Sequence, residues 1–507
     1  MDQDPPRLGT AADAYFEDHR ESDDLGRRAV RGGIVSVAMQ YCNGALQVLA
    51  TIVLARLLTP ADFGLVAIVT VTTSFAPLLI DFGLGDATAQ RSRITPSQIS
   101  SLFWLASGLG VALAVLVAAC SPLIAAIYRE PQLEPIALCT GITFVLWGVS
   151  NQHLALLRRT MQFGRIARIQ FFATLAGVVV AIVLALAGYG YWSLVARPIV
   201  RALWVAVGAW RGCSWRPGRP AFDDEVKSMA RFGLHVVSFS VTFAISGAVD
   251  RMALGLFYRP AVVGYYQNAI TLYQYSIVMA LEQVHTVGSA ALSKLQFNPV
   301  ALREKYQAAL STLAYFIMPA AAILSVTADD VTLLLLGEKW RASGLLLRIL
   351  ALRGIFYVVE HSQGWLHLSI GRVDRWRNWG IVSLACQIIA VLAGLRFGPR
   401  GVAVACVIEG VLIAIPSISY AGRPIGVGST LVIRAVGPEL IGAISTAALG
   451  TWLRMTIFAS CSSLERIVLA VVCCIAIYMI VVVGIFRRTE PLRVARSVLQ
   501  HRLRSDP

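Results

Sequence analysis

The 507-residue chain is 57% hydrophobic and only 14% charged, and its mean hydropathy is +0.67. A soluble fold could not cover so much apolar surface, so the composition excludes an ordinary soluble domain and predicts an integral membrane protein. The net charge of +15 is carried largely by arginines between apolar stretches, a distribution that favours membrane topology over nucleic-acid binding.

The chain begins with a polar, acidic segment, residues 1–28, which lacks the apolar core of a secretory signal and is predicted to stay attached as a cytosolic tail. Beyond it, apolar stretches alternate with short polar breaks, and their lengths match the ~20 residues that cross a ~30 Å hydrocarbon core. We therefore expect an all-α membrane fold with about fourteen transmembrane helices. The predicted spans are 32–56, 62–85, 98–127, 134–156, 168–187, 191–210, 229–256, 262–291, 305–327, 343–368, 378–396, 400–420, 431–453 and 466–486.

The basic residues predict how these spans are oriented. Cytoplasmic loops are enriched in Lys and Arg, and a cytoplasmic N-terminus makes every second loop basic while the opposite loops hold few such residues. The predicted cytoplasmic loops contain Arg91, Arg93, Arg158, Arg159, Arg165, Arg211, Arg216, Arg219, Lys227, Lys294, Arg303, Lys305, Arg372, Arg375 and Arg377. Both termini are therefore predicted to be cytoplasmic, which requires an even number of spans.

An internal repeat recurs at a spacing of 200 residues. The run LARLLTPADFG at 54–64 aligns with LGLFYRPAVVG at 254–264, and Arg31 aligns with Arg231. Each copy has a basic membrane edge, a span, a Pro-Ala hairpin and a second span. Because six spans separate the copies, the halves are predicted to share one topology and to be related by an axis along the membrane normal.

A weaker match pairs Gly190, before span six, with Gly398, before span twelve. Two bundles related in this way enclose a central cavity that opens to either side in alternation. The predicted organisation is a cytosolic tail at 1–28, six-helix bundles at 29–215 and 220–421, two extra transmembrane helices within 428–487, and a basic cytosolic tail at 488–507.

Four segments resemble a known family: LARLLTPADFGLVAIV at 54–69, IDFGLGDATAQ at 80–90, GYGYWSLVA at 188–196 and VDRMALGLFYRPAVVGYYQNA at 249–269. They are similar to the polysaccharide transporter branch, the Wzx-like flippases, of the multidrug/oligosaccharidyl-lipid/polysaccharide exporter superfamily. With the span count and the repeat, the resemblance covers about residues 30–490.

The resemblance implies a transporter and not an enzyme. Members of that family carry oligosaccharide repeat units, linked to undecaprenyl pyrophosphate, across the bacterial inner membrane for assembly into O-antigen, capsule or exopolysaccharide. The implied partners are the lipid-linked oligosaccharide, membrane lipids, a polysaccharide polymerase and a chain-length regulator. No cofactor is expected beyond a coupling ion, H⁺ or Na⁺, and the nine cysteines lack metal-ligand spacing.

Arginines are the candidates for holding the pyrophosphate. The guanidinium stays charged at working pH and binds phosphate oxygens in bidentate fashion. One alternative is that arginines at helix starts anchor the membrane edge. The other is that arginines within spans pair with carboxylates on neighbouring helices. The predicted substrate-binding residues are Arg31 and Arg231 at equivalent helix starts, Arg197 and Arg201 in span six, and Arg251 in span seven.

Carboxylates inside spans are the candidates for coupling and gating, because an intramembrane ionisable group is costly and usually functional. The candidates for coupling and gating are Asp81, Asp250, Glu282 and Glu360, and Glu409 in span twelve is predicted only as a carboxylate partner for an arginine within the spans. Asp81 and Glu282 lie one position apart in the repeat alignment, which also suits a shared structural role.

Span ten contains several ionisable residues together. Glu360 is followed by His361, and Arg353 and His367 lie in the same span. Histidine exchanges protons near neutral pH, so the group indicates a proton relay, with core packing of the histidines as the alternative.

The pair Asp250-Arg251 has no charged counterpart in the first half, where Ala50 and Thr51 occupy the equivalent positions. A charge pair present in one half is not required by the shared scaffold, so it is predicted to handle substrate or ion. Because adjacent helix residues point about 100° apart, the two charges are not expected to neutralise each other.

Two other functions are compatible with parts of the sequence. A multidrug or cation antiporter of the same superfamily would carry acidic residues and few arginines in its cavity, and the arginine excess argues against it. A membrane-embedded polysaccharide polymerase or glycosyltransferase would need a large extramembrane loop with catalytic groups, and the predicted connections are too short for one.

Overall fold

The computed structural model describes residues 24–81, 94–221, 244–279 and 292–488, with a few single residues between these ranges and without the side chains of residues 24–37. Every regular element in this part of the chain is a helix, as the apolar patterning predicts. The chain divides into two compact units, Met1–Val263 and Gly264–Pro507. Each unit has buried hydrophobic clusters of its own.

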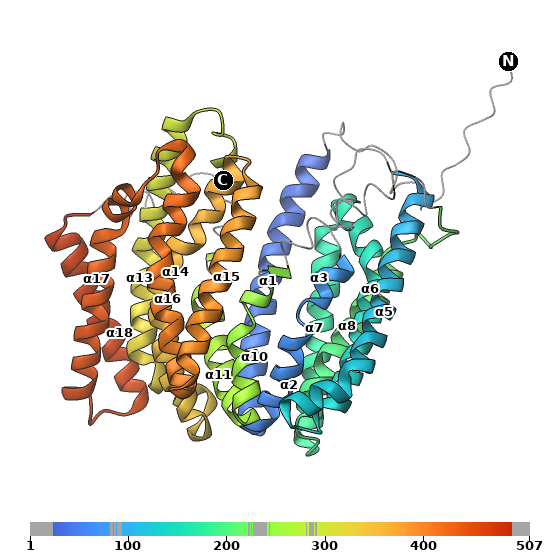
Figure 1. The fold of residues 1–507 in the computed structure, drawn as a ribbon, viewed down its shortest axis with the longest axis horizontal. Helices are drawn as coiled ribbons and strands as arrows, with labels where there is room; N and C mark the ends of the chain where they lie inside the picture. The colour runs from blue at the N-terminus through green and yellow to red at the C-terminus, as the bar shows by residue number, and fades with distance from the viewer. Residues whose placement is uncertain are drawn as a thin grey trace. The chain divides into compact units, whose positions relative to one another are not determined.

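The first unit is coloured blue to green in Figure 1. Its helices are α1 (Asp24–Leu57), α2 (Pro60–Thr72), α3 (Ala76–Asp81), α5 (Pro96–Tyr128), α6 (Leu133–Arg159), α7 (Phe163–Leu186), α8 (Trp192–Gly212) and α10 (Val249–Phe257), and α11 (Pro260–Tyr273) crosses the boundary between the units. α5 packs along α6, α7 packs along both α8 and α1, and α6 also contacts α8.

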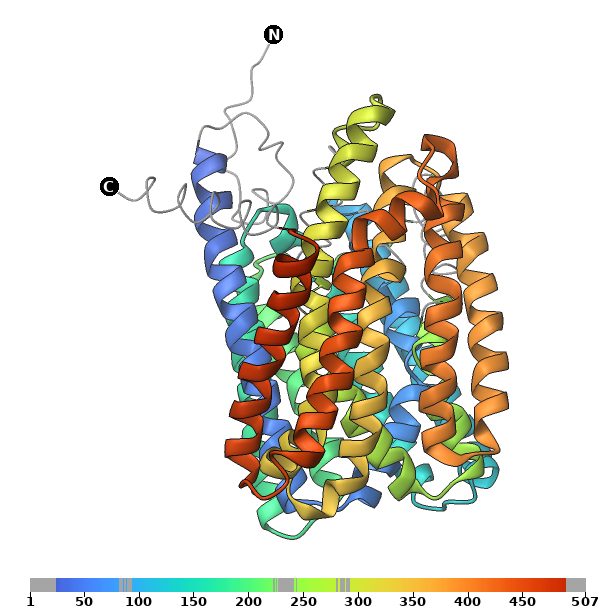
Figure 2. The ribbon, with the colours of Figure 1, turned by 90° about the vertical axis from the view of Figure 1, so that its left-hand side faces the viewer.

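The second unit contains long helices that run side by side, coloured yellow to red in Figure 2. They are α13 (Pro299–Leu336), α14 (Arg341–Ser369), α15 (Val373–Leu395), α16 (Gly398–Gly422), α17 (Ser429–Thr456) and α18 (Ser463–Met479), with short π or 3₁₀ turns η3 (Gln274–Val278), η4 (Glu338–Trp340), η5 (Arg423–Ile425) and η6 (Ile480–Ile485). α14 packs against α13 and α16, and α17 and α18 pack against α13.

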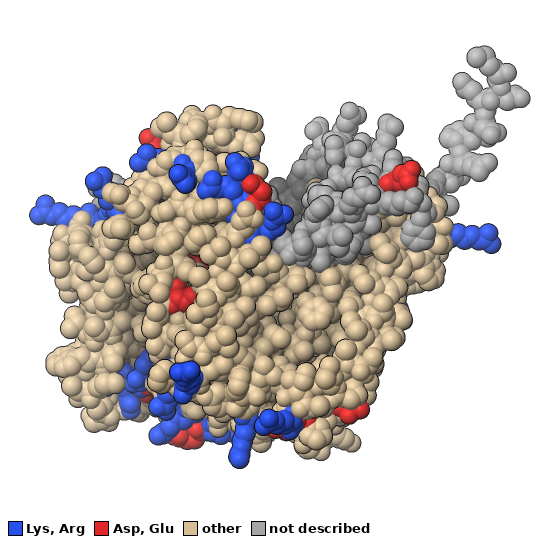
Figure 3. All heavy atoms as spheres, viewed as in Figure 1, with Lys and Arg blue, Asp and Glu red and all other residues tan. Residues whose placement is uncertain are grey.

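The described residues include 12 helices that are long and apolar enough to cross a membrane, and the protein is a multi-pass membrane protein. These helices correspond to the first six and the last six predicted spans. The other two, 229–256 and 262–291, include residues outside the described ranges, so the total of fourteen and the predicted bundle boundaries stay predictions. On the face shown in Figure 3, Lys and Arg gather toward the upper and lower ends, and the surface between them is mostly uncharged.

The repeat at a spacing of 200 residues is confirmed at its hairpins. α1 ends at Leu57 and α10 at Phe257, and the following helices begin at Pro60 and Pro260. Proline suits the first helical position because its φ angle is already helical and its missing N–H would have no partner there. A Cβ atom at Gly64 would overlap the backbone of Pro260, so glycine lets the two related hairpins touch within the first unit.

The second span differs from its predicted form. The sequence predicts a continuous helix over 62–85, but α2 and α3 are separated by a turn at residues 73–75. The hydroxyl groups of Thr73 and Ser74 each donate a hydrogen bond of 2.8 Å to a backbone carbonyl of α2. These bonds give the last carbonyl groups of α2 hydrogen-bond donors at the turn.

An ionic network joins the last two helices to the bundle of the second unit. The predicted span 305–327 continues to Leu336 in α13, and this extension places Asp329 and Asp330 inside the helix. Arg454 of α17 lies 2.7 Å from the carboxylate of Asp330 and 3.2 Å from that of Asp329. The network is completed by Arg466 of α18, 3.4 Å from Asp330, and by Arg348 of α14, which pairs with Asp329.

Replacing Arg454 with glutamine is expected to lower the thermal unfolding midpoint of the purified protein. The side chains of Arg454 and Asp330 are 10% and 5% exposed, and breaking a buried pair by removing one partner costs about 3 kcal/mol. Arg341→Gln is the matched control, because Arg341 forms an exposed pair with Glu338 in the same unit. Equal midpoints for the two variants would show that the network contributes nothing to stability.

Candidate functional site

Two helix pairs, α6 with α8 and α14 with α16, occupy equivalent places in the two halves of the repeat. Gly190 lies just before α8 and Gly398 is the first residue of α16, at a spacing of 208 residues, and both have positive φ angles, 55° and 75°. The burial patterns of α8 and α16 agree at the same spacing. Ala202, Ala206 and Ala209 are buried in α8, and Gly410, Ala414 and Ser417 are buried in α16.

This alignment pairs Arg201 with Glu409. Arg201 directly precedes Ala202, and Glu409 directly precedes Gly410. The two halves therefore carry opposite charges at equivalent positions, a cation on α8 and an anion on α16. Each charged residue belongs to a separate site, one in each unit.

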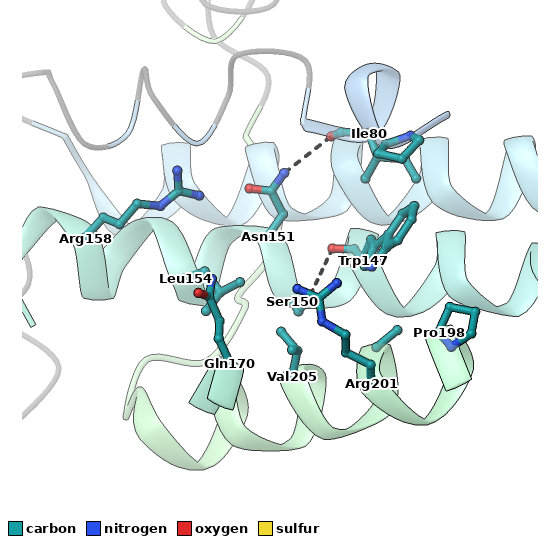
Figure 4. A pocket seen from close by; sticks show the side chains of 12 residues that line it. Ile80, Trp147, Ser150, Asn151, Leu154, Arg158, Gln170, Pro198, Arg201 and Val205 are labelled. Carbon is teal, nitrogen blue, oxygen red and sulfur yellow. Dashed lines mark hydrogen bonds between the residues drawn. The ribbon is translucent and has the colours of Figure 1, made fainter. Parts of the chain in front are cut away.

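The site in the first unit is a pocket of about 240 Å³ between α3, α6, α7 and α8. Its lining residues are Pro77, Ile80, Trp147, Ser150, Asn151, Leu154, Arg158, Gln170, Pro198, Arg201, Ala202 and Val205. Two of them are guanidinium groups, and none of the described lining residues is a carboxylate. Figure 4 shows Arg201 reaching from α8 toward Ser150, and Arg158 further along α6. The arrangement is suited to an anionic ligand.

Close packing of α7 on α8 holds the arginines of α8 in place. A Cβ atom at Gly177 would come within 2.7 Å of the carbonyl oxygen of Arg197 and 3.5 Å of the Cβ of Arg201. Glycine therefore allows the two helix backbones to approach beside the pocket. Arg197, one turn before Arg201, is half-buried and is not among the lining residues.

The site in the second unit is an ionic cluster on α14 and α16. A guanidinium nitrogen of Arg353 lies 3.3 Å from the carboxylate of Glu409 and 3.8 Å from that of Glu360. A Cβ atom at Gly410 would meet the Arg353 side chain at 3.4 Å, so Arg353 passes over this glycine to reach Glu409. The predicted carboxylates Glu360 and Glu409 are thus brought together by one arginine.

A second ionic contact involves the residue next to Glu360 on α14. Nε2 of His361 lies 3.7 Å from a carboxylate oxygen of Glu282, whose side chain is 53% exposed. The ring of His361 lies 5.3 Å, centroid to centroid, from that of Tyr357. Glu282 is thus an exposed partner of His361, and Glu360, the sequence neighbour of His361, is half-buried. His367 lies apart from these residues, buried beside Trp376 and Tyr420, so the structure does not place it in the predicted relay.

The prediction that Asp250 and Arg251 do not neutralise each other is wrong. They occupy the first turn of α10, and Nε of Arg251 lies 3.4 Å from Oδ1 of Asp250. The same oxygen accepts a hydrogen bond of 2.8 Å from the backbone N–H of Arg251. Arg251 also donates to the carbonyl oxygen of Gly247. The helix begins at Val249, and the long arginine side chain folds back toward this helix start, so the 100° separation does not keep the charges apart.

Neutralising one member of this pair is expected to reduce the amount of folded protein more than neutralising both. Asp250→Asn or Arg251→Gln leaves one buried charge without its partner, whereas the double variant leaves none. Contacting pairs of this kind have coupling energies of about 1 kcal/mol. The measurement compares the amounts of monodisperse protein in detergent for the two single variants and the double variant. A double variant that folds normally but transports slowly would instead assign the pair to transport.

The side chains of three predicted site residues lie outside the described part of the structure. Arg31 lies in α1 and Asp81 at the end of α3, but their side chains are outside the described part, and Arg231 is outside it altogether. Arg158 lines the pocket although its position next to Arg159 in the sequence predicts a cytoplasmic loop. The apolar residues of this span continue to residue 157, and this pattern could have indicated that the helix extends to Arg158.

Comparisons with known proteins agree with this architecture. The profile of a family described as polysaccharide biosynthesis protein matches residues 53–344. The lipopolysaccharide biosynthesis protein WzxC of Escherichia coli (strain K12) is 27% identical over 351 residues, which cover 68% of this chain and 70% of WzxC. The teichuronic acid biosynthesis protein TuaB of Bacillus subtilis (strain 168) is 25% identical over 365 residues, covering 70% and 74%.

Among solved structures, the lipid II flippase MurJ in an inward closed conformation has a TM-score of 0.70 to this chain. The match covers 90% of this chain and 99% of MurJ at 14% sequence identity. At this identity, the likeness establishes the fold and not the substrate.

Proposed function

The chain belongs to the polysaccharide biosynthesis protein family, and from this premise we propose that it is a flippase for oligosaccharides linked to undecaprenyl pyrophosphate. It moves these repeat units across the bacterial inner membrane for assembly into O-antigen, capsule or exopolysaccharide. The observation that carries the proposal is the pocket of the first unit, which is lined by Arg158 and Arg201 and has no carboxylate among its described lining residues.

The pocket provides what a pyrophosphate requires inside a bilayer. A bare charge in the hydrocarbon core costs several kcal/mol or more, and guanidinium groups offset this cost through charge-assisted hydrogen bonds to phosphate oxygens. In the proposal, Arg201 and Arg158 hold the pyrophosphate. Arg197 shapes the helix beside it, and Arg31 and Arg231 attract the lipid at the cytoplasmic cavity mouth. The undecaprenyl chain stays in the lipid.

The ionic cluster of the second unit supplies the coupling. Glu360 and Glu409 bind and release an ion as the halves alternate between inward-open and outward-open states, and Glu282 and His361 connect them to the exterior of the bundle. Asp81 closes the first half near the end of α3. The driving ion is H⁺ or Na⁺, and no other cofactor takes part.

Loading from the cytoplasm follows from the predicted orientation. With both termini cytoplasmic, Arg158 near the end of α6 lies toward the cytoplasmic side, where lipid-linked repeat units are made. The released repeat unit then reaches a polysaccharide polymerase and a chain-length regulator at the periplasmic face.

A multidrug or cation antiporter is the second candidate, and the acidic cluster of the second unit is the observation that favours it. Arg353 opposes this function, because a fixed cation between Glu360 and Glu409 repels a cationic drug. The carboxylate-free lining described for the first-unit pocket opposes it as well.

Reconstituted vesicles test the proposal directly. The purified protein is expected to move a fluorescent undecaprenyl-pyrophosphate oligosaccharide between leaflets and to leave a fluorescent phosphatidylcholine in place. A deletion strain is expected to lose a surface or secreted polysaccharide while still making the lipid-linked repeat unit. Efflux of organic cations without oligosaccharide movement would overturn the proposal.

A further inference from the structure

The ionic cluster of the second unit holds more negative than positive groups. Arg353 supplies one cation for Glu360 and Glu409. Glu409 is 4% exposed, and its Oε1 and the Oε2 of Glu360 have no hydrogen-bond partner among the described residues. With both carboxylates ionised, the cluster would keep a net negative charge inside the membrane, which is costly. One bound monovalent cation makes it neutral.

The geometry favours a proton over a metal cation. A hard metal cation needs several oxygen ligands around it, and here the guanidinium of Arg353 already lies against both carboxylates. Within the described ranges, no group of three or more His, Cys, Asp or Glu side chains is arranged to hold a metal ion. A proton needs a single carboxylate lone pair, and the unbonded oxygen of Glu409 offers one.

We propose that the coupling ion of this transporter is a proton, one per cycle, which is shared by Glu409 and Glu360 and balanced by Arg353 as a built-in cation. The inference rests on the proposed function and specifies its coupling site. Binding adds one proton to one carboxylate oxygen and forms a neutral carboxyl group. Arg353 then pairs with the carboxylate that stays ionised. Release reverses the step, and the proton moves toward the cytoplasm as the lipid moves outward.

The surrounding groups provide an entry for the proton. Glu282 is exposed and touches His361, which adjoins Glu360 on α14. Among the described residues, the other ionisable groups beside the cluster are phenols and a thiol: Tyr357 on α14, Tyr273 at the end of α11 and Cys406 on α16. Tyr306 on α13 lies nearby, with its hydroxyl bonded to Ser362 on α14. None of these neutral groups replaces the missing positive charge.

Vesicles with imposed gradients test which ion drives transport. The wild-type protein and a lipid-linked oligosaccharide are used with the membrane potential clamped to zero. In sodium-free buffer, a gradient of one pH unit is expected to shift the steady-state distribution of the lipid about tenfold, because one proton per cycle transmits a tenfold ratio. A Na⁺ gradient at equal pH is expected to shift nothing. The inference is overturned if only a Na⁺ gradient shifts the distribution of the lipid. It is also overturned if the lipid moves between leaflets but neither gradient shifts its distribution. In both cases flipping itself is established. Absence of movement under every gradient contradicts the proposed function.

A binding measurement supplies a readout without transport. The thermal unfolding midpoint of the wild-type protein is expected to be the same in NaCl and KCl at equal ionic strength. Arg353→Gln removes the built-in cation, so its midpoint is expected to be higher in NaCl than in KCl. Arg341→Gln, which lies outside the cluster, is the control and is expected to behave as wild type. A Na⁺-specific rise in the wild-type midpoint overturns the inference, and this arm needs no variant to fold.

Discussion

Replacing Arg201 with alanine is expected to slow the flipping of a lipid-linked oligosaccharide about a hundredfold. The substitution removes a charge-assisted, bidentate contact with the pyrophosphate that is worth about 3 kcal/mol. Arg201→Lys is expected to recover part of the rate, because lysine keeps the charge but lacks the planar fork. The measurement is the initial flipping rate in vesicles, normalised to folded protein.

The control for Arg201 lies on the same helix. Arg211 is an exposed arginine in the last turn of α8 and does not line the pocket. Arg211→Ala is therefore expected to keep nearly the wild-type rate. If Arg201→Ala also transports normally, the pocket is not the pyrophosphate site, and Arg31 and Arg231 become the leading candidates.

Replacing Glu409 with glutamine is expected to abolish uphill transport and to leave substrate binding nearly unchanged. Glutamine has the shape of a protonated glutamate, so the cluster stays permanently neutral with Arg353 paired to Glu360. The variant therefore has no charge change to couple to an ion gradient. The steady-state distribution of the lipid under a gradient measures uphill transport, and titration with the lipid in detergent measures binding.

An exposed carboxylate of the same unit provides the comparison. Glu338 pairs with Arg341 at the surface, and Glu338→Gln is expected to transport as the wild type does. Gradient-driven accumulation by Glu409→Gln would rule out Glu409 as the coupling group. Loss of binding in that variant would assign Glu409 to the substrate site instead.

The parts of the fold that depend on local chemistry could be predicted from the sequence. The apolar stretches determine the spans because lipid is their solvent, and the Pro-Ala runs determine the hairpins at residues 57–60 and 257–260 because proline starts a helix easily. Arg201, Glu360 and Glu409 could be singled out because charge within a span is expensive. The repeat alignment paired the two hairpins correctly.

Contacts that join distant helices could not be predicted in the same way. The network around Asp330 depends on where α13 ends and on Arg454, which follows 124 residues later. Nothing in the local pattern pairs these residues. The pocket role of Arg158 depended on the continuation of α6, and the pairing of Asp250 with Arg251 depended on the start of α10. Helix ends are the least certain part of a sequence-based prediction, and here they decided which charges meet.

The ionic network also has a consequence for the surrounding bilayer. Because Arg454 and Arg466 bind α17 and α18 to α13, this helix pair cannot stay behind in the lipid when the second unit moves. In the proposed transport cycle, the apolar stretch over Ser463–Ile485, most of which is not buried inside the protein, moves together with the second unit. Mismatch between such a surface and the hydrocarbon thickness costs a fraction of a kcal/mol per Å. The turnover rate of the proposed flippase is therefore expected to depend on acyl-chain length, with an optimum at one membrane thickness.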